Sequence, residues 1–152
     1  MPKRPFTFMA VPAIREAARA DAGVLAQLMG EMGCPVTPEA FWARIERMAG
    51  PSHRTFVADL DGRVVGFAGC STLAIYESDH PTCWVMAFVV SQPFRRHGVG
   101  RILIQAVERW SAEQGLPDIR MHCAEGSADT HAFYEACGFV RSGLRFKKPV
   151  DR

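Results

Sequence analysis

An apolar run, a glycine-rich turn and an amphipathic helix follow one another in the middle of this chain and leave few folds open to it. Thr82–Val90 predicts a strand buried on both faces, because its apolar residues form a continuous run and do not alternate with polar ones. Ser91–Phe94 break this strand, and Arg95–Arg101 then form a turn with the sequence RRHGVGR. The next helix places its apolar residues on one face of a 3.6-residue period, namely Val99, Ile102, Leu103, Ala106, Val107 and Trp110.

Strand and helix patterns alternate along the rest of the chain. Two early helices are expected, over residues 22–32 and 38–48, and Asp61-Gly62 predicts a two-residue hairpin turn. The expected strands cover residues 13–16, 55–60, 63–75, 82–90, 119–123, 139–141 and 144–147, and a last helix covers residues 130–137. The order β-α-α-β-β-β-α-β-α-β-β predicts a mixed α/β layer.

The size and charge of the chain bound its domain count and its partners. A length of 152 residues fits one domain, with residues 1–12 as a loose N-terminal extension. The 18 basic and 16 acidic side chains leave a net charge of +2, which is too mild to indicate a nucleic-acid partner. No apolar run approaches the ~18 residues of a membrane-spanning helix. We therefore expect neither nucleic acid nor a membrane as a partner.

The cysteines and the N-terminus bear on the compartment. The five cysteines are odd in number, widely spaced and free of any C-x-x-C pair. This pattern predicts reduced thiols and argues against disulfides and a zinc site. Charged residues from Arg15 onward come too early for the apolar core of a secretory signal. We therefore expect a cytoplasmic protein that binds no metal ion.

The turn at residues 95–101 predicts an anion site. The first N–H groups of a helix have no partner within it, and the helix dipole adds positive charge at the same end. Gly98 and Gly100 let a diphosphate approach the backbone, and the neighbouring arginines add charged donors. The turn lacks the Lys-Ser/Thr of a P-loop, and Leu103 stands where a dinucleotide fingerprint needs glycine. A diphosphate-bearing cofactor of another kind is therefore expected.

Two motifs in order carry a family resemblance. The first is Arg-x-x-Gly-x-Gly after a hydrophobic strand, at residues 95–100, and the second is AFYEACGF at residues 132–139. Together they resemble the GNAT family of acetyl-CoA-dependent N-acetyltransferases, and the resemblance covers residues 13–148. It implies an α/β fold with a mixed, mostly antiparallel central sheet of six to seven strands and about four flanking helices. It also implies one catalytic domain over residues 1–152 and acetyl-CoA as the cosubstrate.

The resemblance implies direct transfer of an acetyl group to a primary amine in a ternary complex. Tyr134 would protonate the departing thiolate, and a backbone N–H near Val89 would stabilise the oxyanion. The base stays open among groups near the expected acceptor side, namely Glu31, Glu77, Asp79, His80, His122 and Glu125. By the same resemblance the cofactor would contact Phe88, Val89, Val90, Arg95, Arg96, His97, Gly98, Val99, Gly100, Arg101, Ser127 and Phe133. Ser127 stands where the family often has asparagine.

Two other interpretations compete with an active enzyme. One is an acyl-CoA-binding sensor or assembly domain without catalysis, and the presence of Tyr134, which a decayed enzyme would be free to lose, favours the enzyme. The other is a nucleotide-binding module, and the missing P-loop lysine counts against it. The acceptor would be a small-molecule or peptide amine, and Glu31, Glu77 and Asp79 suit a cationic one. Dimers are frequent among similar proteins, so a homodimer stays open.

Overall fold

The computed structural model describes residues 10–123 and 128–151 of the chain. The chain divides into two compact units, Met1–Arg120 and Met121–Arg152. The first unit holds most of the sheet and three of the helices, and the second holds the last helix and the C-terminal segment. All five cysteines are free of disulfide bonds.

The sheet has five strands in the order β1-β2-β3-β4-β5. Their bounds are β1 Ala13–Glu16, β2 His53–Leu60, β3 Arg63–Leu73, β4 Thr82–Val90 and β5 Ile119–Met121. The pairs β1–β2, β2–β3 and β3–β4 are antiparallel. β4 therefore lies inside the sheet, between β3 and β5, and both Val85 and Val89 are almost fully buried. The strand predicted from the apolar run is confirmed, but its burial on both faces is wrong, because Met86 is 45% exposed and Trp84 and Phe88 on the same face are only partly buried.

The hairpin between β2 and β3 turns at the predicted dipeptide. Asp61 and Gly62 both have positive φ angles, 50° and 87°, which is the backbone of a type I′ turn. Leu60 pairs directly with Arg63, and the Gly62 N–H donates a 2.7 Å hydrogen bond to Asp59 Oδ1. The turn therefore sets the register between β2 and β3 at this end of the hairpin.

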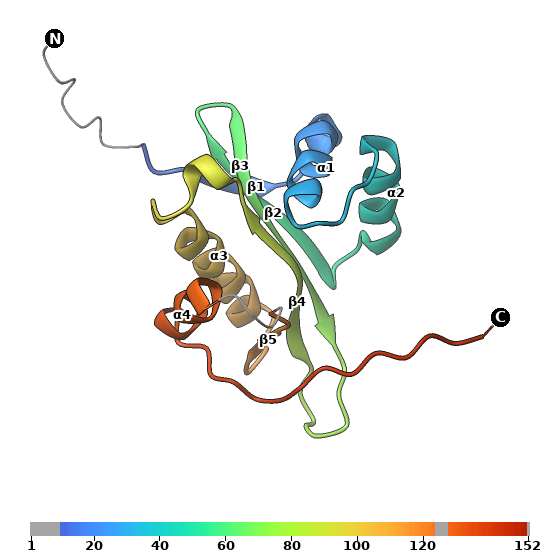
Figure 1. Ribbon diagram of the computed structural model, residues 1–152. Helices are drawn as coiled ribbons and strands as arrows, with labels where there is room; N and C mark the ends of the chain where they lie inside the picture. The colour runs from blue at the N-terminus through green and yellow to red at the C-terminus, as the bar shows by residue number, and fades with distance from the viewer. Residues whose placement is uncertain (1–9, 124–127, 152) are drawn as a thin grey trace, which may run out of the picture. The chain divides into compact units, whose positions relative to one another are not determined.

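Helices cover both faces of the sheet within the first unit. Their bounds are α1 Ala22–Glu31, α2 Pro38–Met48 and α3 Val99–Glu113, and α4 Ala128–Ala136 follows in the second unit. α1 and α2 lie on one face and α3 on the other (Figure 1). The core under α1 and α2 consists of Leu25, Leu28, Phe41, Ile45, Val57, Val64, Phe67 and Val89. Among the described residues, no helix combines the length and apolar character needed to cross a membrane.

Local signals explain where α2 and α3 begin. The Thr37 side chain accepts a 3.2 Å hydrogen bond from Ala40 N, and Pro38 occupies the first helical position, as the sequence predicts. α3 begins directly after Gly98, and its apolar face is buried, with Leu103 and Val107 fully so. α3 thereby anchors the glycine-rich turn to the sheet.

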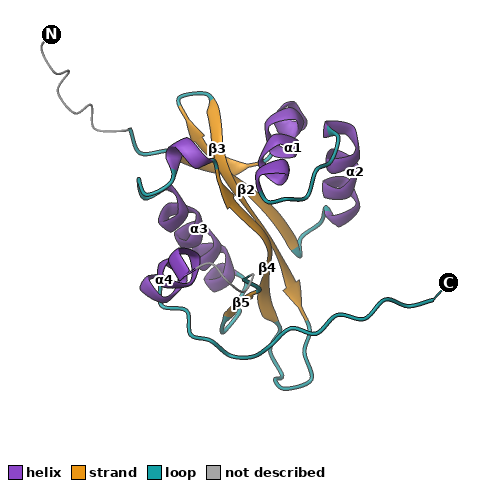
Figure 2. Cartoon of the chain, viewed as in Figure 1, coloured by secondary structure: helices purple, strands orange, loops and turns teal. Residues whose placement is uncertain are grey.

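The two closing strands predicted at residues 139–141 and 144–147 are wrong, and so is the sheet of six to seven strands. Residues 139–151 form no helix or strand and run as a loop (Figure 2). Their alternating apolar pattern favours a strand, but a strand also needs a neighbour for its backbone and a core for its side chains. Val140, Leu144 and Phe146 are 83%, 76% and 88% exposed, so no core buries this pattern.

Candidate cofactor site

The end of β4 supplies one wall of the candidate site. Phe67 pairs with Val89, and the N–H of Ser91 donates a 2.8 Å hydrogen bond to Val65 O. Hydrogen-bonded pairs alternate along an antiparallel ladder, so Val89 also directs its backbone groups toward β3. Phe88 and Val90 then direct theirs toward the other edge of β4. The Val89 side chain belongs to the core, so its contribution at this wall is to fix the strand.

The segment between β4 and the turn is held at several points. The 3-10 helix η2 (Gln92–Phe94) is closed by a 2.9 Å hydrogen bond from Phe94 N to Ser91 O. The Arg63 guanidinium carbon lies 5.0 Å from the centre of the Phe94 ring, a cation–π contact from the beginning of β3. Arg95 Nε donates a 2.9 Å hydrogen bond back to Val90 O. These contacts fix the direction from which the chain enters the turn.

The turn itself presents backbone donors at the start of α3. Arg96 and Gly98 have φ angles of 65° and 84°, in the left-handed region. Gly98 caps α3 without a side-chain hydrogen bond, so the first amides of the helix, at Val99, Gly100 and Arg101, have no partner inside it. Residues 95–98 are exposed, and a Cβ added at Gly98 would meet no heavy atom within 4 Å. This open, donor-lined corner fits a diphosphate.

Charged side chains surround the same corner. Arg96 and Arg101 are exposed, and the positive end of α3 adds to their field. His97 Nδ1 lies 2.7 Å from Arg95 O. Because a carbonyl only accepts, Nδ1 carries the proton, and the His97 ring helps to shape the turn. The predicted residues from Phe88 to Arg101 therefore form one continuous strand–turn–helix corner in the first unit.

His122, Phe133 and Tyr134 belong to the second unit. The Tyr134 ring lies 5.4 Å from the Phe133 ring and 5.8 Å from the Phe139 ring, measured between centroids. Burial, followed by the nearby thiols of Cys123 and Cys137, raises the pKa of Tyr134 to about 12. The Tyr134 hydroxyl is therefore protonated throughout the physiological range. His122 is exposed, while Ser127 and Glu125 lie outside the described residues.

Sequence reasoning missed two contacts that shape this corner. Glu31, expected as a base or an acceptor contact, instead accepts a 2.9 Å hydrogen bond from Gln92 N, 61 residues away. Arg63 was not singled out at all, although its guanidinium lies over Phe94. Both contacts cross between elements distant in the sequence, so no local spacing signals them.

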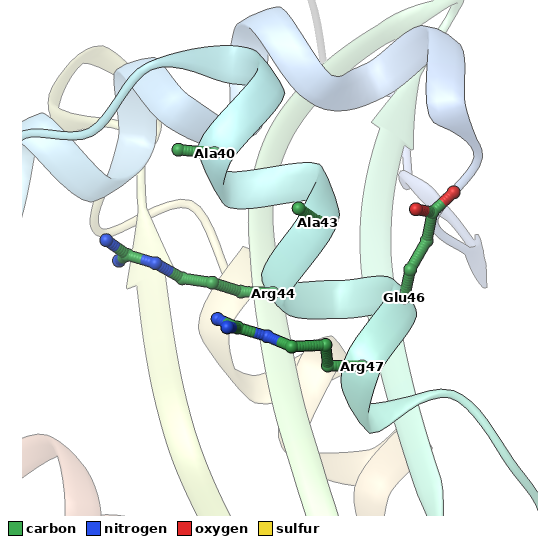
Figure 3. Close-up of a pocket in the computed structure, with 5 residues that line it drawn as sticks. All are labelled: Ala40, Ala43, Arg44, Glu46 and Arg47. Carbon is green, nitrogen blue, oxygen red and sulfur yellow. The ribbon is translucent and has the colours of Figure 1, made fainter.

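The first unit also has a surface hollow whose lining residues differ from those of the candidate cofactor site. It measures about 560 Å³ and lies on the exposed face of α2, lined by Ala40, Ala43, Arg44, Glu46 and Arg47. Arg44 and Arg47 point to the same side and Glu46 points away from them (Figure 3). Phe41 and Ile45 on the opposite face of α2 pack into the core. The hollow includes no residue of the turn, so it is separate from the candidate site.

Within residues 10–123 and 128–151, no group of three or more His, Cys, Asp or Glu side chains is arranged to hold a metal ion.

The chain matches a known protein family over most of its length. The model of the acetyltransferase (GNAT) family matches residues 22–139. Among curated proteins, the aminoglycoside N(6')-acetyltransferase type 1 of Stenotrophomonas maltophilia is 29% identical over 147 residues, which cover 92% of this chain and 95% of that protein.

Solved structures share the fold at low sequence identity. One is AAC(6')-Iy in complex with the bisubstrate analogue CoA-S-monomethyl-acetylneamine, with a TM-score of 0.78, 22% identity, and coverage of 93% of this chain and 100% of that one. Another is glucosamine-6-phosphate N-acetyltransferase from Arabidopsis thaliana, with a TM-score of 0.76, 21% identity, and coverage of 91% and 98%.

Proposed function

Because the chain belongs to the GNAT acetyltransferase family, we propose that it transfers an acetyl group from acetyl-CoA to a primary amine of a small molecule. The observation that carries the proposal is the corner at residues 95–101, where free helix-end amides, a left-handed Gly98 and open space coincide. The family match includes parts of both units, which supports one catalytic domain over residues 1–152.

The geometry of the corner supports the proposed cofactor contacts. The amides of Val99, Gly100 and Arg101 hold the diphosphate of CoA, and the Arg96 and Arg101 side chains add charged donors. The backbone groups of Phe88 and Val90 hold the pantetheine arm as a neighbouring strand would. Arg95 and His97 fix the shape of this corner through hydrogen bonds to backbone carbonyls, and Val89 anchors it in the core. Contacts from Phe133 and Ser127 are proposed from the family resemblance.

The chemistry needs a proton donor for the leaving thiolate. Acetyl-CoA supplies the thioester carbonyl that a neutral amine attacks. A backbone N–H near Val89, at the end of β4, stabilises the oxyanion. Tyr134 donates its proton toward the departing sulfur, and its pKa of about 12 means that the hydroxyl carries this proton at physiological pH.

The proposed acceptor is a cationic amine. The Stenotrophomonas maltophilia relative and AAC(6')-Iy are both named as aminoglycoside acetyltransferases, and aminoglycosides carry several primary amines. Glu77 and Asp79 in the β3–β4 loop are exposed carboxylates that suit such a polycation. The proton that the amine loses has candidate acceptors in His80 and His122, which are exposed as well.

The proposal is tested by following free thiol released from acetyl-CoA against a panel of amines. The panel contains aminoglycosides, linear polyamines and a lysine peptide, and each is run with the wild type and with Tyr134→Phe. We expect acceptor-dependent thiol release that falls about 10–100-fold in the variant. Equal turnover in both proteins would remove Tyr134 from the mechanism. Tight acetyl-CoA binding with no turnover on any amine would favour a non-catalytic acyl-CoA sensor.

A further inference from the structure

Glu31 connects α1 to the segment that leads into the turn. It is the last residue of α1, and its Oε1 atom accepts the 2.9 Å hydrogen bond from Gln92 N. The same oxygen lies 3.9 Å from Arg95 Nη2. Gln92 is the first residue of η2, so the Glu31 carboxylate caps this short helix from outside. One carboxylate oxygen therefore contacts both ends of the segment from Gln92 to Arg95.

Arg95 extends this contact to β4. While its Nη2 atom faces Glu31, its Nε atom donates to Val90 O at 2.9 Å. The guanidinium thus lies between the end of β4 and the end of α1. Immediately after Arg95 the backbone enters the left-handed conformation at Arg96, with φ of 65°. The start of the turn is consequently fixed by contacts from two other elements.

We propose that Glu31 is a positioning residue for the cofactor, which holds Gln92 and Arg95 so that the amides of Val99–Arg101 face the diphosphate. This inference rests on the proposed function, in which those amides bind CoA. Without Glu31 the segment would lose one of the contacts that hold it, so cofactor binding would have to supply part of its order, and this would reduce affinity. Arg95 thus contacts Glu31 through Nη2 and Val90 O through Nε, so both contacts of its guanidinium are made within the protein.

Considered by charge alone, the removal of Glu31 should raise the affinity for CoA and not lower it. A carboxylate near a diphosphate site repels the anion, so its removal would tighten CoA binding. The Arg95 and Glu31 side chains are 50% and 29% exposed, so solvent and salt screen this repulsion. The positioning contact is a short hydrogen bond from a backbone amide, which screening weakens less. The two effects are therefore separated by the sign of the change in affinity.

The test compares Glu31→Ala and Glu31→Gln with a control in which a different surface ion pair is broken. The control is Glu16→Gln, because Glu16 on β1 forms a 2.8 Å ion pair with Arg54 and does not contact the turn. Calorimetric titration with CoA and with 3′-dephospho-CoA, which keeps the diphosphate, gives the dissociation constants. Steady-state kinetics give kcat and the KM for acetyl-CoA, and thermal unfolding checks that each variant is folded.

We expect Glu31→Ala to weaken CoA binding about 5–10-fold, the usual range for one lost hydrogen bond. The KM for acetyl-CoA should rise in parallel while kcat stays near the wild-type value. Glu31→Gln keeps an acceptor oxygen for Gln92 N and should recover most of the affinity. The loss should be the same for 3′-dephospho-CoA, and Glu16→Gln should bind both ligands like the wild type.

Several results would overturn the inference. Unchanged or tighter CoA binding by Glu31→Ala would show that Glu31 does not position the turn. A fall in kcat at constant affinity would instead assign Glu31 to the acceptor. A loss that disappears with 3′-dephospho-CoA would show action at a part of the ligand other than the diphosphate. A wild-type protein that binds no CoA would refute the proposed function itself, and this inference with it.

Discussion

The backbone of Gly66 on β3 lies so close to Val89 on β4 that a Cβ atom on Gly66 would meet Val89 O at 2.9 Å. The same atom would meet Leu103 Cδ1 of α3 at 3.3 Å and Val90 Cα at 3.4 Å. β3, the end of β4 and α3 thus meet at a position that has no room for a side chain. We expect Gly66→Ala to lower the free energy of unfolding by about 1–3 kcal/mol, because a backbone carbonyl must shift.

A matched control for this variant lies on the same strand. A Cβ at Gly69 would meet Ala87 Cβ at 3.9 Å, which is ordinary van der Waals contact. Gly69→Ala should therefore unfold close to the wild-type temperature. Because the shift in Gly66→Ala falls at the end of β4, we also expect this variant alone to bind CoA more weakly. Equal unfolding temperatures for the two variants would contradict the tight approach of Gly66 and Val89.

Gly98 tests whether the open side of the turn receives the cofactor. Its φ of 84° is unfavourable for a branched residue, and the space beside it is empty of protein atoms. Gly98→Val should therefore lose CoA affinity by more than about tenfold, or ~1.4 kcal/mol, because its methyl groups would occupy the diphosphate's path.

Gly115→Val is the matched control, because it introduces the same kind of backbone strain away from the candidate cofactor site. It lies beyond the other end of α3, with φ of 71° and no heavy atom within 4 Å of an added Cβ. Gly115→Val should lose stability to a similar degree, since both variants force a branched residue into the left-handed region. Its CoA affinity, measured by calorimetry, should match that of the wild type. A parallel loss of affinity in both variants would mean that backbone strain alone explains the effect.

The sequence predicted those parts of the fold and of the candidate site that depend on local pattern. The apolar run predicted β4, the 3.6-residue period predicted the buried face of α3, and Asp61-Gly62 predicted the hairpin turn. The contacts that hold the corner were not predictable in this way. The hydrogen bond from Gln92 to Glu31 joins residues 61 positions apart, and it depends on how α1 packs against the sheet.

The wrong predictions share a physical cause. Residues 139–141 and 144–147 alternate like strands, but alternation describes only what the side chains could do if a neighbouring strand were present. Val140 and Phe146 are instead exposed in a loop. The cluster of His53, Thr55 and Ser71 was likewise not anticipated, because the hydrogen bond between His53 and Ser71 forms only when β2 and β3 pair.

Tyr134 has a predicted signature in the pH profile. Because burial and two nearby thiols raise its pKa to about 12, its hydroxyl does not ionise below pH 10. We therefore expect kcat to show no alkaline decline up to about pH 10 in the wild type, measured with a saturating amine. A decline with an apparent pKa near 9 that is absent from the residual activity of Tyr134→Phe would show that the pKa of Tyr134 is not raised in the working enzyme.

His53 makes the stability of the first unit depend on pH. It is buried, with Nδ1 2.8 Å from Ser71 Oγ and Nε2 3.1 Å from Thr55 Oγ1. Burial, and then the charge of Arg54, lower the pKa of His53 below its ordinary value of 6.5. The unfolded chain therefore binds a proton on His53 more readily than the folded one. Stability should be fully present above about pH 6.5 and should fall as the pH drops from there toward the folded-state pKa.

The measurement is the free energy of unfolding by urea between pH 5 and pH 8. The wild type should lose stability below pH 6.5, and His53→Gln, which has no titrating ring, should show a flatter profile. Identical slopes in the two proteins would mean that His53 titrates alike in the folded and unfolded states.

A crystal structure of the protein with CoA would show whether the backbone amides at the start of α3 bind the diphosphate. We predict diphosphate oxygens within hydrogen-bond distance of the amides of Val99, Gly100 and Arg101, with the pantetheine arm along Phe88 and Val90. A structure in which CoA is bound elsewhere, or in which this corner stays empty at saturating CoA, would contradict the claim.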